Sequence, residues 1–135
     1  MADKHLTLDI VTPSKVVYSG EVLSFSAPGT EGGFQVLVNH APLLSSLTVG
    51  QVKITDAAGK EFHYATSGGF VEVKNNKVIL LAETAERSDE IDIKRAEEAK
   101  RRAHERLQKE EQIDEERARA ALIRAINRLK IAGSN

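Results

Sequence analysis

The sequence of 135 residues contains no cysteine and no tryptophan, and only 4% of its residues are aromatic. Without cysteine there is neither a disulfide framework nor a thiolate metal site, and with so few aromatic residues any core must be built from small aliphatic side chains. No run of about 18 apolar residues is present to span a bilayer as a helix. The N-terminal residues lack the charged and then apolar pattern of a signal peptide. These absences predict a cytosolic or organelle-matrix setting.

The sequence also lacks a large excess of charge of either sign. Its 19 Lys and Arg residues nearly balance its 20 Asp and Glu residues, for a net charge of −1. No long-range field therefore draws the chain toward nucleic acid or an anionic membrane. Arginine, however, is absent before residue 87 and frequent after it. This change of composition predicts two parts: a domain of residues 1–86, rich in glycine and valine, and a charge-dense domain of residues 87–135.

The first part is predicted to consist of short β-strands. Apolar and polar residues alternate from Leu6 to Ile10, which is the period of a half-buried strand. Asn75-Asn76 marks a tight hairpin, because Asn tolerates positive φ. Residues 78–82 form an almost continuous apolar run, which predicts a strand buried on both faces.

Turn signals recur along this first part at Ser19-Gly20, Val49-Gly50 and Gly68-Gly69. They divide the sequence into eight or more short strands. Many short strands with frequent turns are typical of an antiparallel β-sandwich or flattened barrel. The predicted fold class is therefore mainly β plus α: a sandwich or flattened barrel followed by a two-helix hairpin.

The second part is composed of strong helix formers from Asp92 onward. Asp92 is the predicted N-cap of a first helix, with Ser88 or Asp89 as alternatives. The apolar stripe of this helix consists of Ala96, Ala99, Ala103 and Leu107.

A break at residues 112–114 predicts a second helix, with Asp114 as its N-cap and Gly133 at its end. Acidic Glu115 and Glu116 suit its first turn. One continuous helix from Asp92 to Ile131 remains open as an alternative. The apolar stripe of the second helix consists of Ala118, Ala121, Leu122, Ala125, Ile126 and Leu129.

An alanine seam holds two helices together weakly. Each buried CH₂ group contributes roughly 0.8 kcal/mol, so alanine offsets little of the entropy lost when the helices become ordered. We expect the hairpin to be marginal and detachable, and to depend on docking to another surface.

Basic residues of both helices are predicted to share one outer face of an antiparallel hairpin, at 100° per residue. Such a face would suit a polyanion or an acidic helix, and the alternative is a solvated surface of salt bridges. The residues are Arg95, Arg102, Arg106, Arg117, Arg124 and Arg128.

Catalytic and metal-binding patterns are missing from the sequence. There is no P-loop, since residues 29–33 are glycine-rich but lack the lysine and hydroxyl of that motif, and no H-E-x-x-H pattern occurs. The four histidines are scattered, and no serine has the context of an activated nucleophile. We predict neither a catalytic site nor a metal site.

Four segments together resemble the epsilon subunits of F-type ATP synthases. Residues 31–44 resemble the glycine-rich turn and H-A-P-L-L of that family, and residues 67–73 resemble its G-G-F-x-E-V. Residues 91–96 resemble its I-D-x-x-R-A motif, and residues 125–129 its C-terminal end. The match follows the family's order through nearly the whole chain.

The resemblance implies a non-catalytic subunit of the central stalk. In that family the β-sandwich binds the gamma subunit and the ring of c subunits, and so couples proton flow to ATP synthesis. The helical arm, when extended, reaches the beta (and alpha) subunits and inhibits ATP hydrolysis, for which Arg117, Arg119, Arg124 and Arg128 are candidate contacts. The implied location is peripheral, on the cytoplasmic face of a bacterial inner membrane or the stromal face of a thylakoid.

The resemblance also implies a candidate ATP site in the folded arm, with ATP as a regulatory ligand and no required cofactor. Its residues are Asp92, Arg95, Arg124 and Arg128. Arginine suits phosphate recognition. The alternative is that Asp92 only caps a helix and pairs with Arg95.

Two other classes of protein compete with this interpretation. A nucleic-acid-binding tail is disfavoured, because the acids in residues 83–135 are as numerous as the bases and counterion release needs a net basic face. A β-domain with a helical protein-interaction tail outside the ATP synthase is the other alternative. The alanine-rich first helix lacks the heptads of a stable coiled coil.

Overall fold

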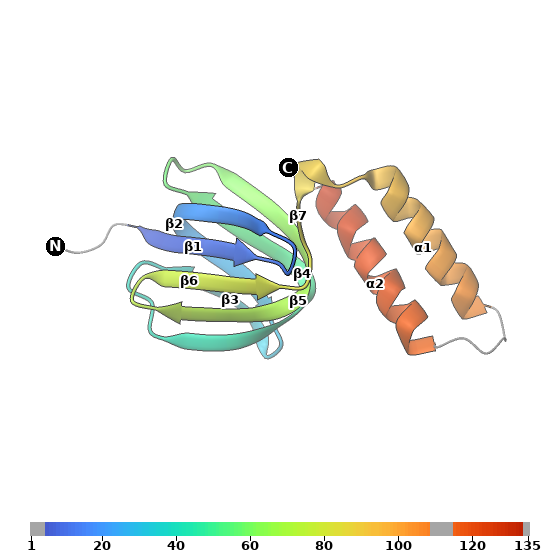
Figure 1. Cartoon of the computed structure of the whole chain (residues 1–135), viewed down its shortest axis with the longest axis horizontal. Helices are drawn as coiled ribbons and strands as arrows, with labels where there is room; N and C mark the ends of the chain where they lie inside the picture. The colour runs from blue at the N-terminus through green and yellow to red at the C-terminus, as the bar shows by residue number, and fades with distance from the viewer. Residues whose placement is uncertain (1–4, 109–114, 134–135) are drawn as a thin grey trace.

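The computed structural model describes residues 5–108 and 115–133. A β-body of seven strands is followed by a hairpin of two helices at one end of it (Figure 1). Helix α2 lies nearer to the β-body and α1 lies outside it (Figure 1). The predicted fold class, a flattened β-barrel followed by a helical hairpin, is confirmed.

The strands close into a ring. Strands β1, β6, β5, β4 and β2 pair in that order, and a further pairing of β1 with β2 closes the barrel. Strand β3 pairs with β2, and strand β7 pairs with β5. All pairs are antiparallel except β1 with β6, which the sequence did not predict. The strands are β1 (Leu6–Val11), β2 (Val16–Gly29), β3 (Gly32–Leu37), β4 (Leu43–Asp56), β5 (Glu61–Lys74), β6 (Lys77–Ala82) and β7 (Ala85–Arg87).

Three of these strands are 14 residues long, and the expectation of eight or more short strands was wrong. Gly20, Gly50 and the pair Gly68-Gly69 lie inside β2, β4 and β5, and each strand continues through them without ending. Gly68 and Gly69 have φ of +107° and +147°, a conformation that favours glycine. By contrast, Asn75 and Asn76 form the predicted hairpin turn, with φ of 52° and 59°.

Strand β6 is buried on one face only, so the prediction of burial on both faces was wrong. Val78, Leu80 and Ala82 point into the barrel, whereas Leu81 is 56% exposed. Buried and more exposed positions alternate along β6. The sequence does not reveal this alternation, because both faces of β6 carry aliphatic side chains.

The main core belongs to the β-body alone. It is aliphatic, as predicted, with Phe25 as its largest fully buried side chain. Leu6, Leu8 and Ile10 of β1 contribute one wall, as their alternation predicted. No helical residue of the described part belongs to this cluster.

A short 3₁₀ helix, η1 (Ser88–Glu90), leads to α1 (Ile93–Gln108) and α2 (Glu115–Ala132). The predicted N-cap is confirmed, since Asp92 Oδ1 accepts a hydrogen bond from the Arg95 backbone N–H at 3.0 Å. The alternative caps lie in η1 and were wrong. Helix α1 packs against α2, so the single continuous helix is excluded. The predicted break and the cap at Asp114 lie outside the described residues.

The alanine seam is present. Ala96 and Ala103 of α1 are buried, as are Ala118 and Ala125 of α2. The second stripe was predicted wrongly at one position, because Ile126 is 44% exposed. Ile131, which the stripe omitted, is instead buried against the β-body.

Candidate functional site

The C-terminal end of α2 docks on the β-body. Ile131 is only 1% exposed and forms a small apolar cluster with Ala65 of β5 and with Ile91, which follows η1. This cluster is separate from the barrel core. Its one large side chain from the hairpin is Ile131, so a single residue provides most of the apolar docking.

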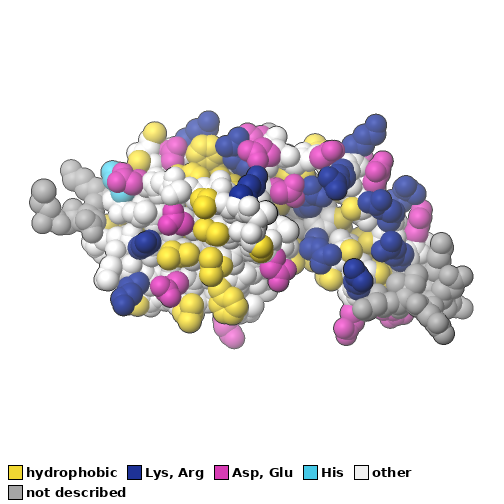
Figure 2. Space-filling model, viewed as in Figure 1, with side chains coloured by type: hydrophobic (Ala, Val, Ile, Leu, Met, Phe, Trp, Pro, Cys, Tyr) yellow, Lys and Arg dark blue, Asp and Glu magenta, His cyan; other side chains and the backbone are white. Residues whose placement is uncertain are grey.

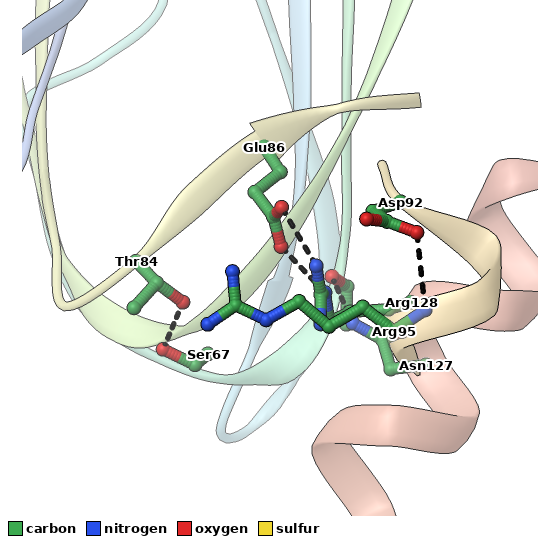
Figure 3. A network of polar contacts seen from close by, with 8 residues as sticks. Ser67, Thr84, Glu86, Asp92, Arg95, Asn127 and Arg128 are labelled. Atoms are coloured by element: carbon green, nitrogen blue, oxygen red, sulfur yellow. Dashed lines mark hydrogen bonds and ion pairs between the residues drawn. The ribbon is translucent and has the colours of Figure 1, made fainter. Parts of the chain in front are cut away.

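Polar contacts also join α2 to the β-body, and Figure 3 shows the residues that make them. Arg128 Nη2 donates a hydrogen bond to Glu86 Oε2 at 2.9 Å, and Nε lies 2.6 Å from Oε1 without the alignment of a hydrogen bond. The Asn127 side chain donates to the backbone oxygen of Gly50 at 3.0 Å. We call the contacts of Asn127, Arg128 and Ile131 with the β-body the docking contacts.

The segment that leads into the hairpin is held to the β-body. Strand β7 pairs with β5, and the side chain of Arg87 lies over the Phe62 ring at 5.7 Å from its centroid. Arg87 Nε donates to Asp89 Oδ1 at 2.6 Å, and this hydrogen bond lowers the pKa of Asp89 below its usual value. The same bond raises the pKa of Arg87. The predicted domain division after residue 86 falls within β7, and it stays a prediction.

A cavity of about 430 Å³ lies between the β-body and the hairpin. We call it the interface cavity. Its β-body side includes the turn between β1 and β2 and parts of β4 and β5, and its hairpin side includes Ala99 of α1 and the inner face of α2. Small-molecule sites commonly have volumes of about 300 to 1,000 Å³, so this space suits a ligand of modest size.

Two of the four predicted ATP-site residues, Arg124 and Arg128, line the interface cavity, whereas Asp92 and Arg95 are not among its lining residues. In the view of Figure 3 the side chain of Arg95 extends past Arg128 on the side of Thr84. The predicted outer face of six arginines was wrong for Arg124 and Arg128, because α2 turns this flank toward the β-body. Within residues 5–108 and 115–133, the guanidinium groups of Arg95 and Arg124 have no hydrogen-bond or ion-pair partner.

The chemistry of the interface cavity favours an anion that can also form hydrogen bonds. Arg124 and Arg128 supply positive charge, although Arg128 pairs with Glu86, and Thr66, Ser67 and Thr84 supply hydroxyl groups. Thr84 donates to the Ser67 hydroxyl at 2.6 Å. None of the four histidines lines the cavity. Among the described residues, no group of three or more His, Cys, Asp or Glu side chains is placed to hold a metal ion.

The docking contacts include residues for which the sequence analysis predicted no role: Glu86, Asn127 and Ile131. One signal was available, because Ile131 is a large apolar residue three and four positions after Arg128 and Asn127, on the same side of the helix. Glu86 gave no such signal, since its partner is 42 residues away in the sequence.

The described helices include none that is long and apolar enough to cross a membrane.

Two family models together match most of the chain. The model "ATP synthase, Delta/Epsilon chain, beta-sandwich domain" matches residues 5–88, and "ATP synthase, Delta/Epsilon chain, long alpha-helix domain" matches residues 89–133.

Relatives of similar length match along nearly the whole sequence. The ATP synthase epsilon chain of Desulforamulus reducens is 52% identical over 130 residues, which cover 96% of this chain and 98% of the relative. The ATP synthase epsilon chain of Nitratidesulfovibrio vulgaris is 50% identical over 133 residues, covering 98% of each. The resemblance drawn from the motifs is thereby confirmed.

Two solved structures share the fold. A chain of the Euglena gracilis mitochondrial ATP synthase (OSCP/F1/c-ring) superposes with a TM-score of 0.79 at 22% identity, covering 91% of this chain and 78% of that one. A chain of the Tetrahymena thermophila mitochondrial ATP synthase (central stalk/c-ring) gives 0.58 at 16% identity, covering 97% and 98%. From its family models and its relatives, the chain belongs to the ATP synthase delta/epsilon chain family.

Proposed function

We propose that this chain is a rotor subunit in the central stalk of an F-type ATP synthase. Its β-body binds the gamma subunit and the c-subunit ring, and so transmits rotation between proton flow and ATP synthesis. The subunit performs no catalysis of its own. The helical hairpin is a regulatory arm that, when released, reaches the beta and alpha subunits and inhibits ATP hydrolysis. The complex holds the chain at the cytoplasmic face of a bacterial inner membrane.

The observation that carries the regulatory part is how lightly the hairpin is attached. Helix α2 meets the β-body through the docking contacts near its C-terminal end, and the helices meet each other along buried alanines. Apart from Ile131, the hairpin buries no large apolar side chain among the described residues. Release therefore breaks the docking contacts and leaves the barrel core intact.

An exposed apolar patch on the β-body supports binding of a partner subunit. Phe70 and Leu81 are each 56% exposed and are cross-strand neighbours on the outer face of β5 and β6. Leu44 of β4 is 70% exposed and pairs with Glu72, two residues from Phe70. Figure 2 shows hydrophobic side chains gathered on this part of the β-body. A contiguous patch of this kind marks a protein interface, and we assign it to the gamma subunit.

The assembled complex tests the regulatory proposal. ATP hydrolysis should be compared for complexes carrying the intact chain and a chain truncated after Arg87. We expect truncation to raise hydrolysis while leaving the subunit bound to the complex, because the patch and the barrel core are retained. Equal hydrolysis at every nucleotide concentration would contradict the inhibitory role of the arm.

ATP is the proposed regulatory ligand of the folded arm, at a site formed by Asp92, Arg95, Arg124 and Arg128. The interface cavity and its two arginines support this assignment. Isothermal titration of the isolated chain with ATP should give a binding signal that Arg95→Ala abolishes. Arg101→Ala is the control, because Arg101 pairs with Glu105 along the exposed side of α1. Absence of heat and of chemical-shift changes at millimolar ATP would end this part of the proposal.

A further inference from the structure

The turn between β1 and β2 forms part of the wall of the interface cavity, on the β-body side. Thr12, Ser14 and Lys15 of this turn line the cavity. The Thr12 backbone N–H donates to the Lys15 carbonyl oxygen at 2.9 Å, and its hydroxyl donates to the same oxygen at 3.2 Å. The Thr12 and Ser14 hydroxyls lie 3.2 Å apart. These bonds fix the turn, so its polar groups are held in place beside the cavity.

The two walls of the cavity carry unneutralised positive charge. The ammonium group of Lys15 and the guanidinium of Arg124 have no ion-pair partner among residues 5–108 and 115–133. Arg128 is already paired with Glu86. Glu83 and Glu86 are the acidic lining residues, so the cations outnumber the acids around a space large enough for a phosphorylated ligand.

We propose that Lys15 is an affinity-determining residue for the phosphate groups of a nucleotide in this cavity. With Lys15 on the β-body and Arg124 on α2, the ligand contacts both parts and ties the hairpin to the β-body. This inference rests on the nucleotide binding proposed above, and it adds a contact from the β-body to a site otherwise made by the arm. A charge-assisted contact to phosphate needs no change of fold, because both cations already border the same space.

Titration of the full-length chain with ATP tests the role of Lys15. Lys15→Gln should weaken ATP binding by roughly tenfold or more, the size expected for a hydrogen bond to a charged group. Lys77→Gln is the matched control. Lys77 is an exposed lysine of β6, and it pairs with Thr7 at the end of β1 that lies away from this turn. It should leave the affinity unchanged.

A second titration identifies which part of the ligand Lys15 contacts. Inorganic triphosphate should lose affinity for the Lys15→Gln variant as ATP does, whereas adenosine should bind both proteins equally. In the wild-type chain, ATP should shift the backbone amide resonances of Ser14 and Lys15. Equal loss for adenosine, or no shift in this turn while α2 shifts, would overturn the assignment.

The outcomes separate this inference from the nucleotide proposal. If ATP binds the wild type and Lys15→Gln equally, only the role of Lys15 is wrong. If ATP fails to bind the wild-type chain, the proposed nucleotide site and the role of Lys15 both fall. The proposed rotor function depends on neither result.

Discussion

Gly69 is the position in β5 where a side chain is least tolerated. Its φ of +147° is rarely adopted by other residues, and a Cβ atom added there would collide with the carbonyl oxygen of Leu81. The bend of β5 therefore depends on the absence of a side chain.

Gly69→Ala should lower the free energy of unfolding by about 3 kcal/mol or more, since both backbone strain and a steric clash are introduced. Urea denaturation measures the change. Gly33→Ala is the control, because the nearest atom to an added Cβ there is 3.8 Å away. Its effect should stay within about 0.5 kcal/mol. Equal stability of the Gly69→Ala variant and the wild type would contradict this account of the bend.

Tyr64 gives the chain a weakness at alkaline pH. It is only 3% exposed, and burial raises the pKa of its phenol, although the charge of Arg87 opposes this. The unfolded chain therefore loses this proton first, near pH 10. Stability is full below that pH and decreases as the pH rises toward the higher folded-state pKa.

Tyr64→Phe should reduce this alkaline loss of stability, because phenylalanine has no proton to lose. The measurement is the urea midpoint at a series of values from about pH 8 to about pH 11. Tyr18 also has a raised pKa, so some slope should remain in the variant. Identical slopes for the two proteins would show that Tyr64 does not cause the loss.

At the scale of elements, the sequence predicted most of the secondary structure but not how long the strands run. Alternation located β1, and the asparagine pair located the turn after β5, because both signals are local. Glycines inside β2, β4 and β5 were interpreted as turns, since bending within a strand depends on which strands lie beside it. Asp92 was predicted as a cap from its neighbours alone, whereas the partner of Arg128 depends on how α2 meets β7.

Helix α2 is held to β7 by the ion pair of Glu86 and Arg128. Glu86→Gln should weaken this hold by about 1 kcal/mol, because the pair is only partly exposed, with side-chain exposures of 36% and 24%. Amide hydrogen exchange in the C-terminal half of α2 should become roughly fivefold faster.

Glu105→Gln is the matched control for this prediction. Glu105 pairs with Arg101 within α1 at 3.1 Å, so its neutralisation removes an ion pair without touching the docking contacts. The double charge reversal Glu86→Arg with Arg128→Glu should restore part of the protection. Equal exchange in both single variants would show that the ion pair does not hold the arm.

At the scale of the whole molecule, the β-body should fold without the hairpin. All residues of the barrel core lie before residue 83, and the docking cluster adds only Ile131 and the partly buried Ala132 from the hairpin. A chain of residues 1–87 should therefore unfold cooperatively in urea and give dispersed amide resonances. A collapsed spectrum would mean that the helices are part of the folding unit and not an attachment.

The candidate site could be predicted only in part, because it forms where two domains meet. The arm's candidate arginines were predicted because residues 91–96 and the second helix resemble segments of the epsilon-subunit family. Lys15 was not found, because its turn and Arg124 are brought to one cavity by the docking of α2. Positions that face each other across two domains leave no local pattern in a sequence.

The attachment of β7 to the β-body bears on where the hairpin can begin to move. Because Arg87 lies over Phe62 and η1 is followed directly by Ile91 and Asp92, we expect the proposed release of the arm to pivot at these two residues. Helix α1, with 16 residues at 1.5 Å per residue, is roughly 24 Å long, and α2, with 18 residues, is roughly 27 Å long. In the proposed released state these helix lengths limit how far the arm reaches, and a few residues inserted before Ile91 would move the start of the arm without lengthening it.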